Sequence, residues 1–263
     1  TTQQIDTFKF IDVQTSQDSR PTTHRDITSL EDQRREAGRD DTRVIVILLD
    51  DYHVRLGNSM RVREQLASWV SQLEPNDLVA VMYPLTPASA LTFSRDHAGT
   101  ADAIMKFSGR KYDYTPRNAY EERYQFQPPE LLERMRNDQT MSAIESLCIV
   151  MGALREGRKT VLFVSEGLSG SLPPGVNVRG VPFPSQPTRQ SDAGLDDRMA
   201  FFASTEILSR MRLVFAAAAR SNTPVYTLDP RGVAVSEFDI DDNVRSEVDR
   251  RVPDLDRIAV LAH

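Results

Sequence analysis

The sequence predicts an α/β fold with a mostly parallel central sheet and helices on both faces. Three observations lead to this prediction. Short apolar runs without polar alternation, of which Val44–Leu49 is the clearest, are typical of strands that are covered on both faces. Segments with helical periodicity lie between these runs, and turn signals separate the two kinds of segment. Strand, helix and strand in alternation form the unit of a parallel, Rossmann-like sheet.

Residues 43–107 supply the first elements. The strand Val44–Leu49 ends at the carboxylates of Asp50 and Asp51. A helix, a second strand, a short candidate third strand and a second helix follow, at Arg61–Leu73, Leu78–Met82, Leu91–Phe93 and Ala98–Phe107. Because ligands bind beyond the carboxyl ends of the strands in such sheets, Asp50 and Asp51 are expected on a ligand-facing edge.

The rest of the alternation contains two irregular segments. An aromatic insertion spans residues 109–130, and a loop rich in Pro, Gly and Ser spans residues 168–197. Helices and strands are expected around them at Thr140–Leu154, Thr160–Val164, Arg198–Arg220 and Pro224–Leu228. The folded domain is therefore expected to cover residues 43–232.

The two ends have a different character. Residues 1–12 contain a short strand-like run, and the polar residues 13–42 are predicted to be a linker in which a helical turn could form. Residues 233–263 form a charged tail whose last stretch, 255–263, has the pattern of a helix that is cut short. Neither end is expected to belong to the main sheet.

Composition limits the classes of partner. The net charge of −6 provides no basic field for a phosphate backbone, so nucleic acid is not an expected partner. Cys148 is the single cysteine, which excludes an internal disulfide and a cysteine-based zinc site. No stretch approaches the roughly 20 apolar residues of a membrane span, so none is expected in this chain.

Three loops carry a resemblance to a known family. Asp50 ends the first strand, Thr140 opens a later helix, and Ser165-Glu166-Gly167 ends another strand. This combination resembles the von Willebrand factor A (vWA) domain, whose metal-ion-dependent adhesion site uses those three loops. The similarity is to a vWA-related family known mainly from acidobacterial genomes, and it lies in Arg43–Arg63, Asp77–Val81, Gly157–Gly167 and Val225–Gly232.

The resemblance implies more than a Rossmann-like vWA fold. It implies a bacterial protein that is secreted or located in the periplasm or cell envelope, since relatives commonly carry a signal peptide. Residues 1–12 are similar to the end of the β-rich domain that commonly precedes the vWA domain in that family. Residues 255–263 resemble a family helix that normally continues further.

The metal site that the resemblance implies is degenerate. Its ligands would be Asp50, Thr140 and Glu166, with Asp51 as a further candidate, and Mg²⁺ or another divalent cation as the metal. Tyr52 and Val54 occupy the two positions where the family has serine hydroxyl ligands. Because Mg²⁺ requires a near-ideal octahedron of oxygen atoms, the expected site is weak or lost. The alternative is that Asp50 and Asp51 cap the following segment and pair with a cation such as Arg55 or Arg61.

The aromatic insertion is the candidate partner-binding segment. Tyr and Arg side chains anchor many protein interfaces because they offer a large contact area. The residues predicted to contact a partner are Tyr112, Tyr114, Arg117, Tyr120 and Tyr124. The alternative is that these rings pack on the domain itself, since most long insertions need aromatic residues to fold.

No enzyme motif is present in the sequence. Phosphate-binding glycine loops, the G-x-S-x-G elbow and paired histidine ligands are all missing. The resemblance to vWA domains implies a non-enzymatic module that binds a protein or peptide at the carboxyl ends of the strands, and this is the predicted function. The main alternative is a metal-free scaffold subunit that self-associates. A hydrolase built on Asp50, His53 and Glu166 is a lesser alternative, because a lone histidine beside acids is more often a salt-bridged surface residue.

Overall fold

The computed structural model describes most of the region that was predicted to be folded. It describes residues 27, 29–154, 156–157, 159–169, 179–180 and 193–232. In the last of these ranges, side chains are described only from residue 205 onward. The predictions for residues 1–12, for 13–26, for most of the 168–197 loop and for the 233–263 tail lie outside these described residues.

Four parallel strands form the sheet, in the spatial order β2-β1-β3-β4. The strands are β1 (Val44–Leu49), β2 (Leu78–Met82), β3 (Lys159–Val164) and β4 (Val225–Leu228). In the central pairings, Val44 lies opposite Leu78 on one side and opposite Lys159 on the other. All six β1 residues are buried, which explains why this run lacks polar alternation. The parallel sheet confirms the predicted α/β, Rossmann-like fold class.

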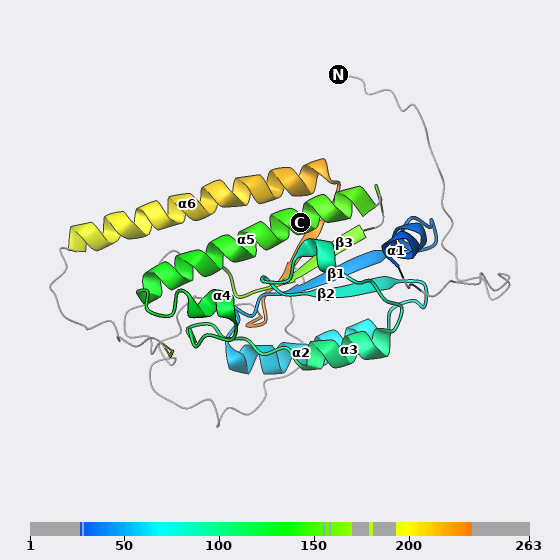
Figure 1. The fold of residues 1–263 in the computed structure, drawn as a ribbon, viewed down its shortest axis with the longest axis horizontal. Helices are drawn as coiled ribbons and strands as arrows, with labels where there is room; N and C mark the ends of the chain where they lie inside the picture. Colours follow the sequence, from blue (N-terminus) through cyan, green and yellow to red (C-terminus); the bar gives the residue numbers. More distant parts are fainter. Residues whose placement is uncertain are drawn as a thin grey trace, which may run out of the picture.

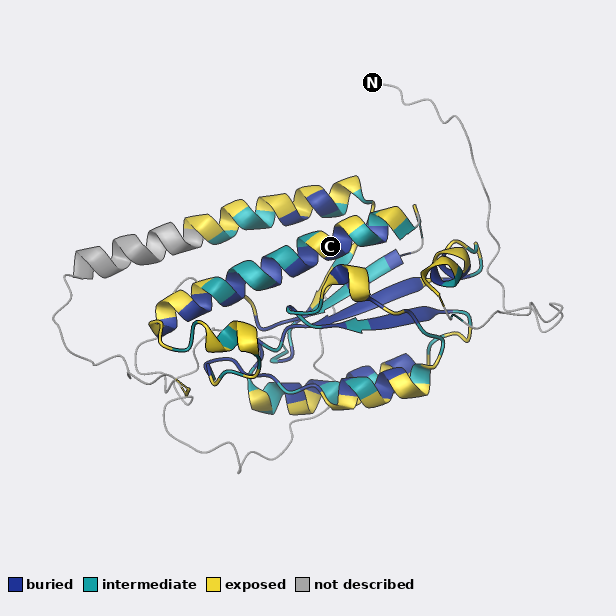
Figure 2. Cartoon of the chain, viewed as in Figure 1, coloured by how far each residue is buried: buried dark blue, intermediate teal, exposed yellow. Residues whose placement is uncertain are grey.

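Helices cover both faces of the sheet, as Figure 1 shows. The helices α2 (Leu56–Ser71) and α3 (His97–Met105) lie on one face, and α5 (Pro129–Leu154) and α6 (Ala193–Arg220) lie on the other. Their buried residues face the sheet where side chains are described (Figure 2). None of the helices in the described part of the chain is both long and apolar enough to cross a membrane.

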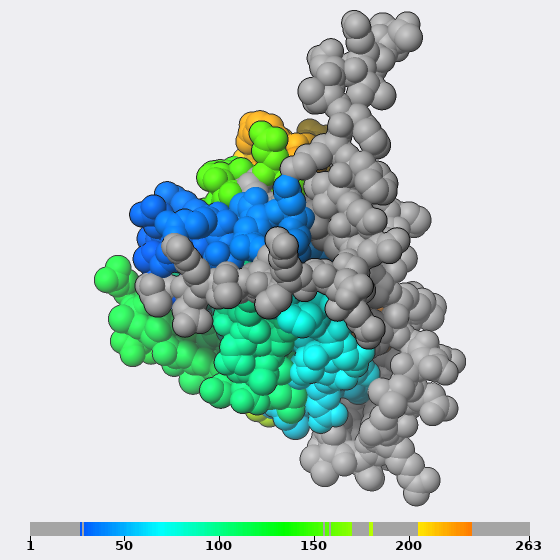
Figure 3. All heavy atoms as spheres, turned by 90° about the vertical axis from the view of Figure 1, so that its right-hand side faces the viewer, coloured from blue at the N-terminus to red at the C-terminus, as the bar shows by residue number. Residues whose placement is uncertain are grey.

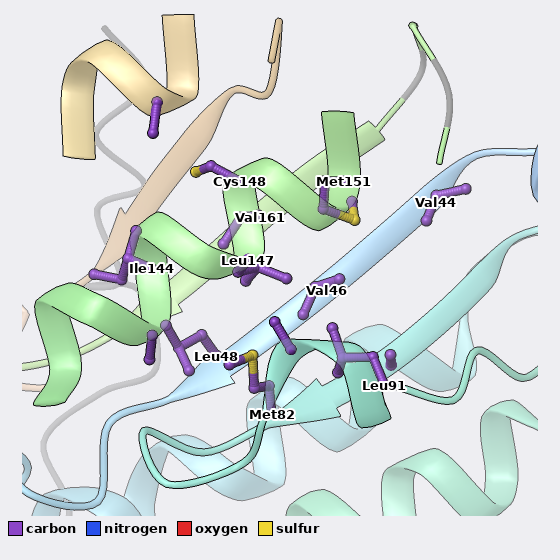
Figure 4. Packing of buried hydrophobic residues seen from close by; sticks show 14 of the residues in the cluster. Val44, Val46, Leu48, Met82, Leu91, Ile144, Leu147, Cys148, Met151 and Val161 are labelled. Atoms are coloured by element: carbon purple, nitrogen blue, oxygen red, sulfur yellow. The ribbon is translucent and has the colours of Figure 1, made fainter. Parts of the chain in front are cut away.

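The core has two halves because β1 side chains alternate between the faces. Figure 4 shows the half beneath α5, where Val46 and Leu48 of β1 lie among residues that include Leu147 and Met151 of α5. On the opposite face, Ile47 and other β1 residues pack against residues of α2 and α3. Leu147 has no exposed surface, so its burial contributes about 2 kcal/mol through the hydrophobic effect.

Helix α1 (Leu30–Ala37) lies within the segment that was expected to be a linker. The Ser29 side chain caps its first turn by accepting a hydrogen bond from the Asp32 backbone N–H. Ala37 is fully buried in the core half beneath α5. Figure 3 shows α1, in dark blue, on the surface at the end of the molecule opposite α4 (Ala119–Glu122). This part of residues 13–42 therefore packs on the domain.

The prediction of a third strand at Leu91–Phe93 is wrong. This segment follows the short 3₁₀ helix η1 (Ala88–Ala90) and forms no strand. The buried side chain of Gln33 takes its backbone groups, donating to the Leu91 carbonyl at 3.1 Å and accepting from the Phe93 N–H at 3.2 Å. A side chain 60 positions away thus satisfies the groups that a neighbouring strand would have paired.

Helix α5 begins at Pro129, well before the predicted start at Thr140. Proline is favoured in the first turn of a helix, and Pro129 follows a second proline at 128. The first turns nevertheless lack apolar periodicity, because their buried face carries Glu133, Arg136 and Asn137. Thr140 therefore lies inside α5 and does not open it.

Candidate functional site at the carboxyl edge of the sheet

The candidate site lies where the strand order changes direction. From β1 the chain continues to β2 on one side of the sheet, whereas β3 and β4 lie on the other side. The carboxyl ends of β1 and β3 are adjacent, because the Asp50 N–H donates to the Val164 carbonyl at 3.0 Å. Ligands of open α/β sheets bind at such switch points. Three groups of polar side chains gather here, and together we call them the carboxyl-edge cluster.

The first group centres on His53 and Asp50, which have no exposed surface. His53 Nδ1 lies 2.9 and 2.8 Å from the two Asp50 carboxylate oxygens. Ser165 Oγ donates to Asp50 Oδ2 at 2.8 Å, and Thr140 Oγ1 donates to Asp50 Oδ1 at 3.3 Å. On the other side of the imidazole ring, Nε2 lies 3.8 Å from Glu133 Oε1. The His53 ring is thus held between two buried carboxylates.

The environment of His53 acts on its pKa in two directions. Burial lowers the pKa, but the charge and hydrogen bond of Asp50 and the charge of Glu133 raise it by more, so the net shift is upward. The expected contact of His53 with an acid is present. The expected surface position is wrong, because Thr140 and Glu133 of α5 close over the ring.

The second group centres on Arg110, from the aromatic insertion. Its Nε donates to Asp51 at 2.8 Å, and its two terminal nitrogens bind both carboxylate oxygens of Glu121, one of them at 2.8 Å. Tyr52 donates its hydroxyl proton to Glu121 at 3.0 Å. The Tyr52 ring contacts the guanidinium groups of Arg110 and Arg136 at 4.6 and 4.9 Å. This group fastens α4 to the loop after β1.

Asp51 pairs with a cation, as the alternative interpretation expected, but that cation is neither Arg55 nor Arg61. Asp50 binds His53, and the cation beside Asp51 is Arg110, 59 positions along the chain. Nothing near Asp51 in the sequence indicates such a long-range contact.

Backbone contacts hold the insertion against the loop after β1. The Gly109 N–H donates to Ser59 Oγ at 2.8 Å, and the Lys111 N–H donates to the Val54 carbonyl at 3.0 Å. A Cβ atom at position 109 would lie 2.3 Å from the Val54 carbonyl oxygen, so this close approach requires glycine. Tyr112 follows with φ at 66°, an uncommon value for a residue with a side chain.

The third group centres on Glu166, which follows β3. Its Oε1 accepts hydrogen bonds from the Arg55 backbone N–H and the Asn58 side chain, both at 2.7 Å. Its Oε2 lies 3.7 Å from Lys111 Nζ and 3.8 Å from Arg55 Nε. The side chains of Glu166 and Lys111 are 0% and 1% exposed, so this ion pair is buried.

The residues predicted to bind a metal do not fit a hard divalent cation. Asp50 and Thr140 meet at 3.3 Å, but the Asp50 oxygens already accept hydrogen bonds from protein donors. Glu166 belongs to a separate group with its own cations. Of the two former hydroxyl positions, Tyr52 directs its hydroxyl to Glu121, and Val54 lies in the apolar core. The described residues contain no cluster of three or more acidic, histidine or cysteine side chains suited to a metal ion.

The predicted partner-binding residues divide into two sets. Tyr112 and Tyr114 are buried, and the Tyr114 hydroxyl donates to Glu133 at 2.8 Å. Packing on the domain, the alternative considered for the insertion, therefore describes these two rings. The other three residues, Arg117, Tyr120 and Tyr124, reach the surface to different degrees. Tyr120 is 40% exposed and meets the Tyr124 ring edge-on at 5.3 Å.

Sequence reasoning missed several residues of the cluster. The sequence pattern does not indicate Glu133 and Arg136, because it predicts a helix that begins only at Thr140. Their spacing of three and four residues up to Thr140 places all three on one helix face, and this signal could have revealed them. Ser165 and Lys111 lie in segments that were noted, but no local pattern indicates their partners.

Comparison with known proteins adds no assignment. No protein-family model matches the sequence, and no curated protein matches it. Membership of the vWA-related family stays a prediction, and the function has to follow from the fold and the carboxyl-edge cluster.

Proposed function

We propose that the chain is a non-enzymatic binding module that takes a protein or peptide on the carboxyl-edge face without requiring a divalent cation. One observation carries the proposal: the acids and bases at the ends of β1 and β3 pair with one another inside the protein. Asp50 binds the His53 ring, and Glu166 lies beside Lys111 and Arg55. Buried pairs of this kind fix the shape of a surface without offering a reactive group to a substrate.

The exposed part of the insertion supplies the contact surface in this proposal. Phe126 is 66% exposed, and Tyr120 and Arg117 lie on the same segment. Residues of these types dominate the energy of many interfaces. Glu121 binds Arg110 beneath them, so the segment is ordered before a partner arrives and less conformational entropy is lost on binding. The resemblance to vWA domains, which bind proteins in related cases, supports the same class of function.

Panning a random peptide display library on the purified protein tests this proposal. Peptides enriched on the wild type should lose binding to a Tyr120→Ala/Phe126→Ala variant, and they should bind equally with Mg²⁺ or EDTA. Leu208→Ala, which removes an exposed apolar side chain on α6, is the matched control. Equal binding to the wild type and the double variant would refute the proposed surface.

A scaffold subunit is the second candidate, because exposed apolar side chains also occur on α5 and α6. Ile149, Leu208 and Phe215 are 58%, 59% and 62% exposed. Light scattering separates the candidates: concentration-dependent self-association that Phe215→Ala abolishes would favour the scaffold.

The geometry gives the hydrolase alternative no support. His53 is fully buried, and its two ring nitrogens face Asp50 and Glu133. Glu166 belongs to a different group of contacts from His53. A hydrolytic activity of the wild type that His53→Ala abolished, with the fold intact by circular dichroism, would reverse this assignment.

A further inference from the structure

Lys111 and Glu166 form a buried ion pair, and Arg55 is a second cation beside the same Glu166 oxygen. Lys111 Nζ and Glu166 Oε2 lie 3.7 Å apart, and among the described residues neither atom has a hydrogen-bond partner. Burying an ammonium group is unfavourable unless an opposite charge compensates it. The compensation at Lys111 comes from Glu166, because no other ion pair of this lysine is found in the described part of the chain.

The backbone imposes the inward position of Lys111. The N–H groups of residues 109, 110 and 111 donate to Ser59 Oγ, the Asp51 carbonyl and the Val54 carbonyl at 2.8, 2.8 and 3.0 Å. Lys111 Nζ also lies 5.6 Å from the Tyr112 ring centroid. The fold of the insertion therefore places the Lys111 ammonium group in the interior, where its position is fixed.

We infer that Lys111 is a resident cation, which supplies at Glu166 the positive charge that a divalent ion would otherwise bring and thereby excludes metal from the carboxyl edge. A metal ion bound at Oε2 would lie close to the Lys111 ammonium and to Arg55 Nε, which is 3.8 Å from the same oxygen. Like charges at such separations in a buried site repel strongly. The inference rests on the metal independence in the proposed function, and it assigns that property mainly to Lys111, because Lys111 is 1% exposed whereas the charge of Arg55, which is 23% exposed, is better screened by solvent.

Lys111→Met keeps most of the side-chain volume and removes the charge. Its melting temperature in EDTA is expected to fall by on the order of 10 °C, because the buried Glu166 carboxylate then keeps only the partly exposed Arg55, 3.8 Å away, as a counter-charge. Millimolar Mn²⁺ should raise the melting temperature of this variant by roughly 5 °C, and free Mn²⁺ measured by electron paramagnetic resonance should decrease. The control is Lys106→Met, because Lys106 is an exposed lysine on the preceding segment. For the wild type and this control, Mn²⁺ should change neither the melting temperature nor the concentration of free Mn²⁺.

The outcomes are distinguishable. If Lys111→Met shows no response to Mn²⁺ while wild type also shows none, the inference about Lys111 is wrong and the proposed metal-independent module stands. If wild type itself binds Mn²⁺, the metal independence in the proposed function is wrong as well. Glu166→Gln should abolish any Mn²⁺ response gained by the Lys111→Met variant, and a response that persists would place the ion elsewhere and overturn the inference.

A double variant keeps the inference testable if Lys111→Met does not fold. Glu166→Gln alone leaves the lysine unpaired, whereas Lys111→Met/Glu166→Gln removes both charges. The double variant should melt at a higher temperature than Glu166→Gln, because only the single variant retains an uncompensated buried charge. A double variant no more stable than Glu166→Gln would show that the two side chains do not compensate each other.

Discussion

The charge of Glu121 is expected to stabilise the protein by about 2 kcal/mol at pH 7, an amount that Glu121→Gln should remove. Burial alone would raise the pKa of this carboxyl, but hydrogen bonds from Arg110, the Arg117 N–H and the Tyr52 hydroxyl outweigh burial and lower it from 4.5 to about 2. At 1.36 kcal/mol per pKa unit, this shift corresponds to at most about 3 kcal/mol. The side chain is 13% exposed, so solvent screening reduces the expected value.

The sign of the pH dependence follows from the direction of the shift. Because folding lowers the pKa of Glu121, its contribution is complete well above the unfolded value near 4.5 and disappears as the pH falls toward the folded value near 2. The stability difference between wild type and Glu121→Gln should therefore be constant above about pH 6. It should shrink below about pH 5 and reach roughly half its size near pH 3.

Urea unfolding followed by circular dichroism at several pH values between 7 and 3 measures this difference. Glu122→Gln is the matched control, because Glu122 is the next residue of α4 and its side chain is exposed. The control should lie within about 0.5 kcal/mol of wild type throughout. A Glu121→Gln deficit that stays the same from pH 7 to pH 3 would refute the assignment to the carboxylate charge, as would a control with an equal deficit.

Three further substitutions test the packing, each by chemical denaturation. Gly109→Ala should destabilise the protein by at least about 1–3 kcal/mol, because its Cβ atom would meet the Val54 carbonyl at 2.3 Å, and a neutral result would mean the insertion shifts freely. Leu147→Ala should cost about 3 kcal/mol and the exposed Ile149→Ala less than about 1, so equal losses would contradict the core assignment. Asp50→Asn should cost about 3–5 kcal/mol, and wild-type stability in this variant would show that the anion is dispensable.

Local patterns were enough to predict the sheet. The run Val44–Leu49 is apolar at every position because both faces of β1 are covered, and the predicted and observed strands coincide. The other three strands lie within one residue of their predicted ends. Burial explains this for β1 and β2, whereas β4 exposes Tyr226 and Thr227 and is marked by the Asp229–Gly232 turn that follows it.

Elements whose partners are polar and distant could not be predicted. The first turns of α5 bury Glu133 and Arg136 against the carboxyl-edge cluster, so their sequence does not read as an amphipathic helix. The sequence of Leu91–Phe93 is typical of a strand, but its backbone groups bind the Gln33 side chain. No strand pattern can indicate such a partner.

In the candidate site too, the sequence indicates some residues but not their distant partners. Asp50, Thr140 and Glu166 were singled out, and all three lie in the carboxyl-edge cluster. Their partners were missed, because the ion pair of Glu166 with Lys111 joins residues 55 positions apart. Long-range pairing depends on how the insertion folds back, and composition carries no signal of it.

The parallel pairing of β1 with β3 has a consequence for biosynthesis. Val44 pairs with Lys159, so a ribosome must add about 115 residues after Val44 before the second neighbour of β1 exists. At about 5–20 residues per second, the apolar run Val44–Leu49 waits on the order of 10 s with one side unpaired. During that interval the nascent chain presents an unprotected strand edge, a recognised starting point for aggregation. Codon usage or chaperone supply over residues 50–159 should therefore affect the yield of folded protein more than equal changes after β3.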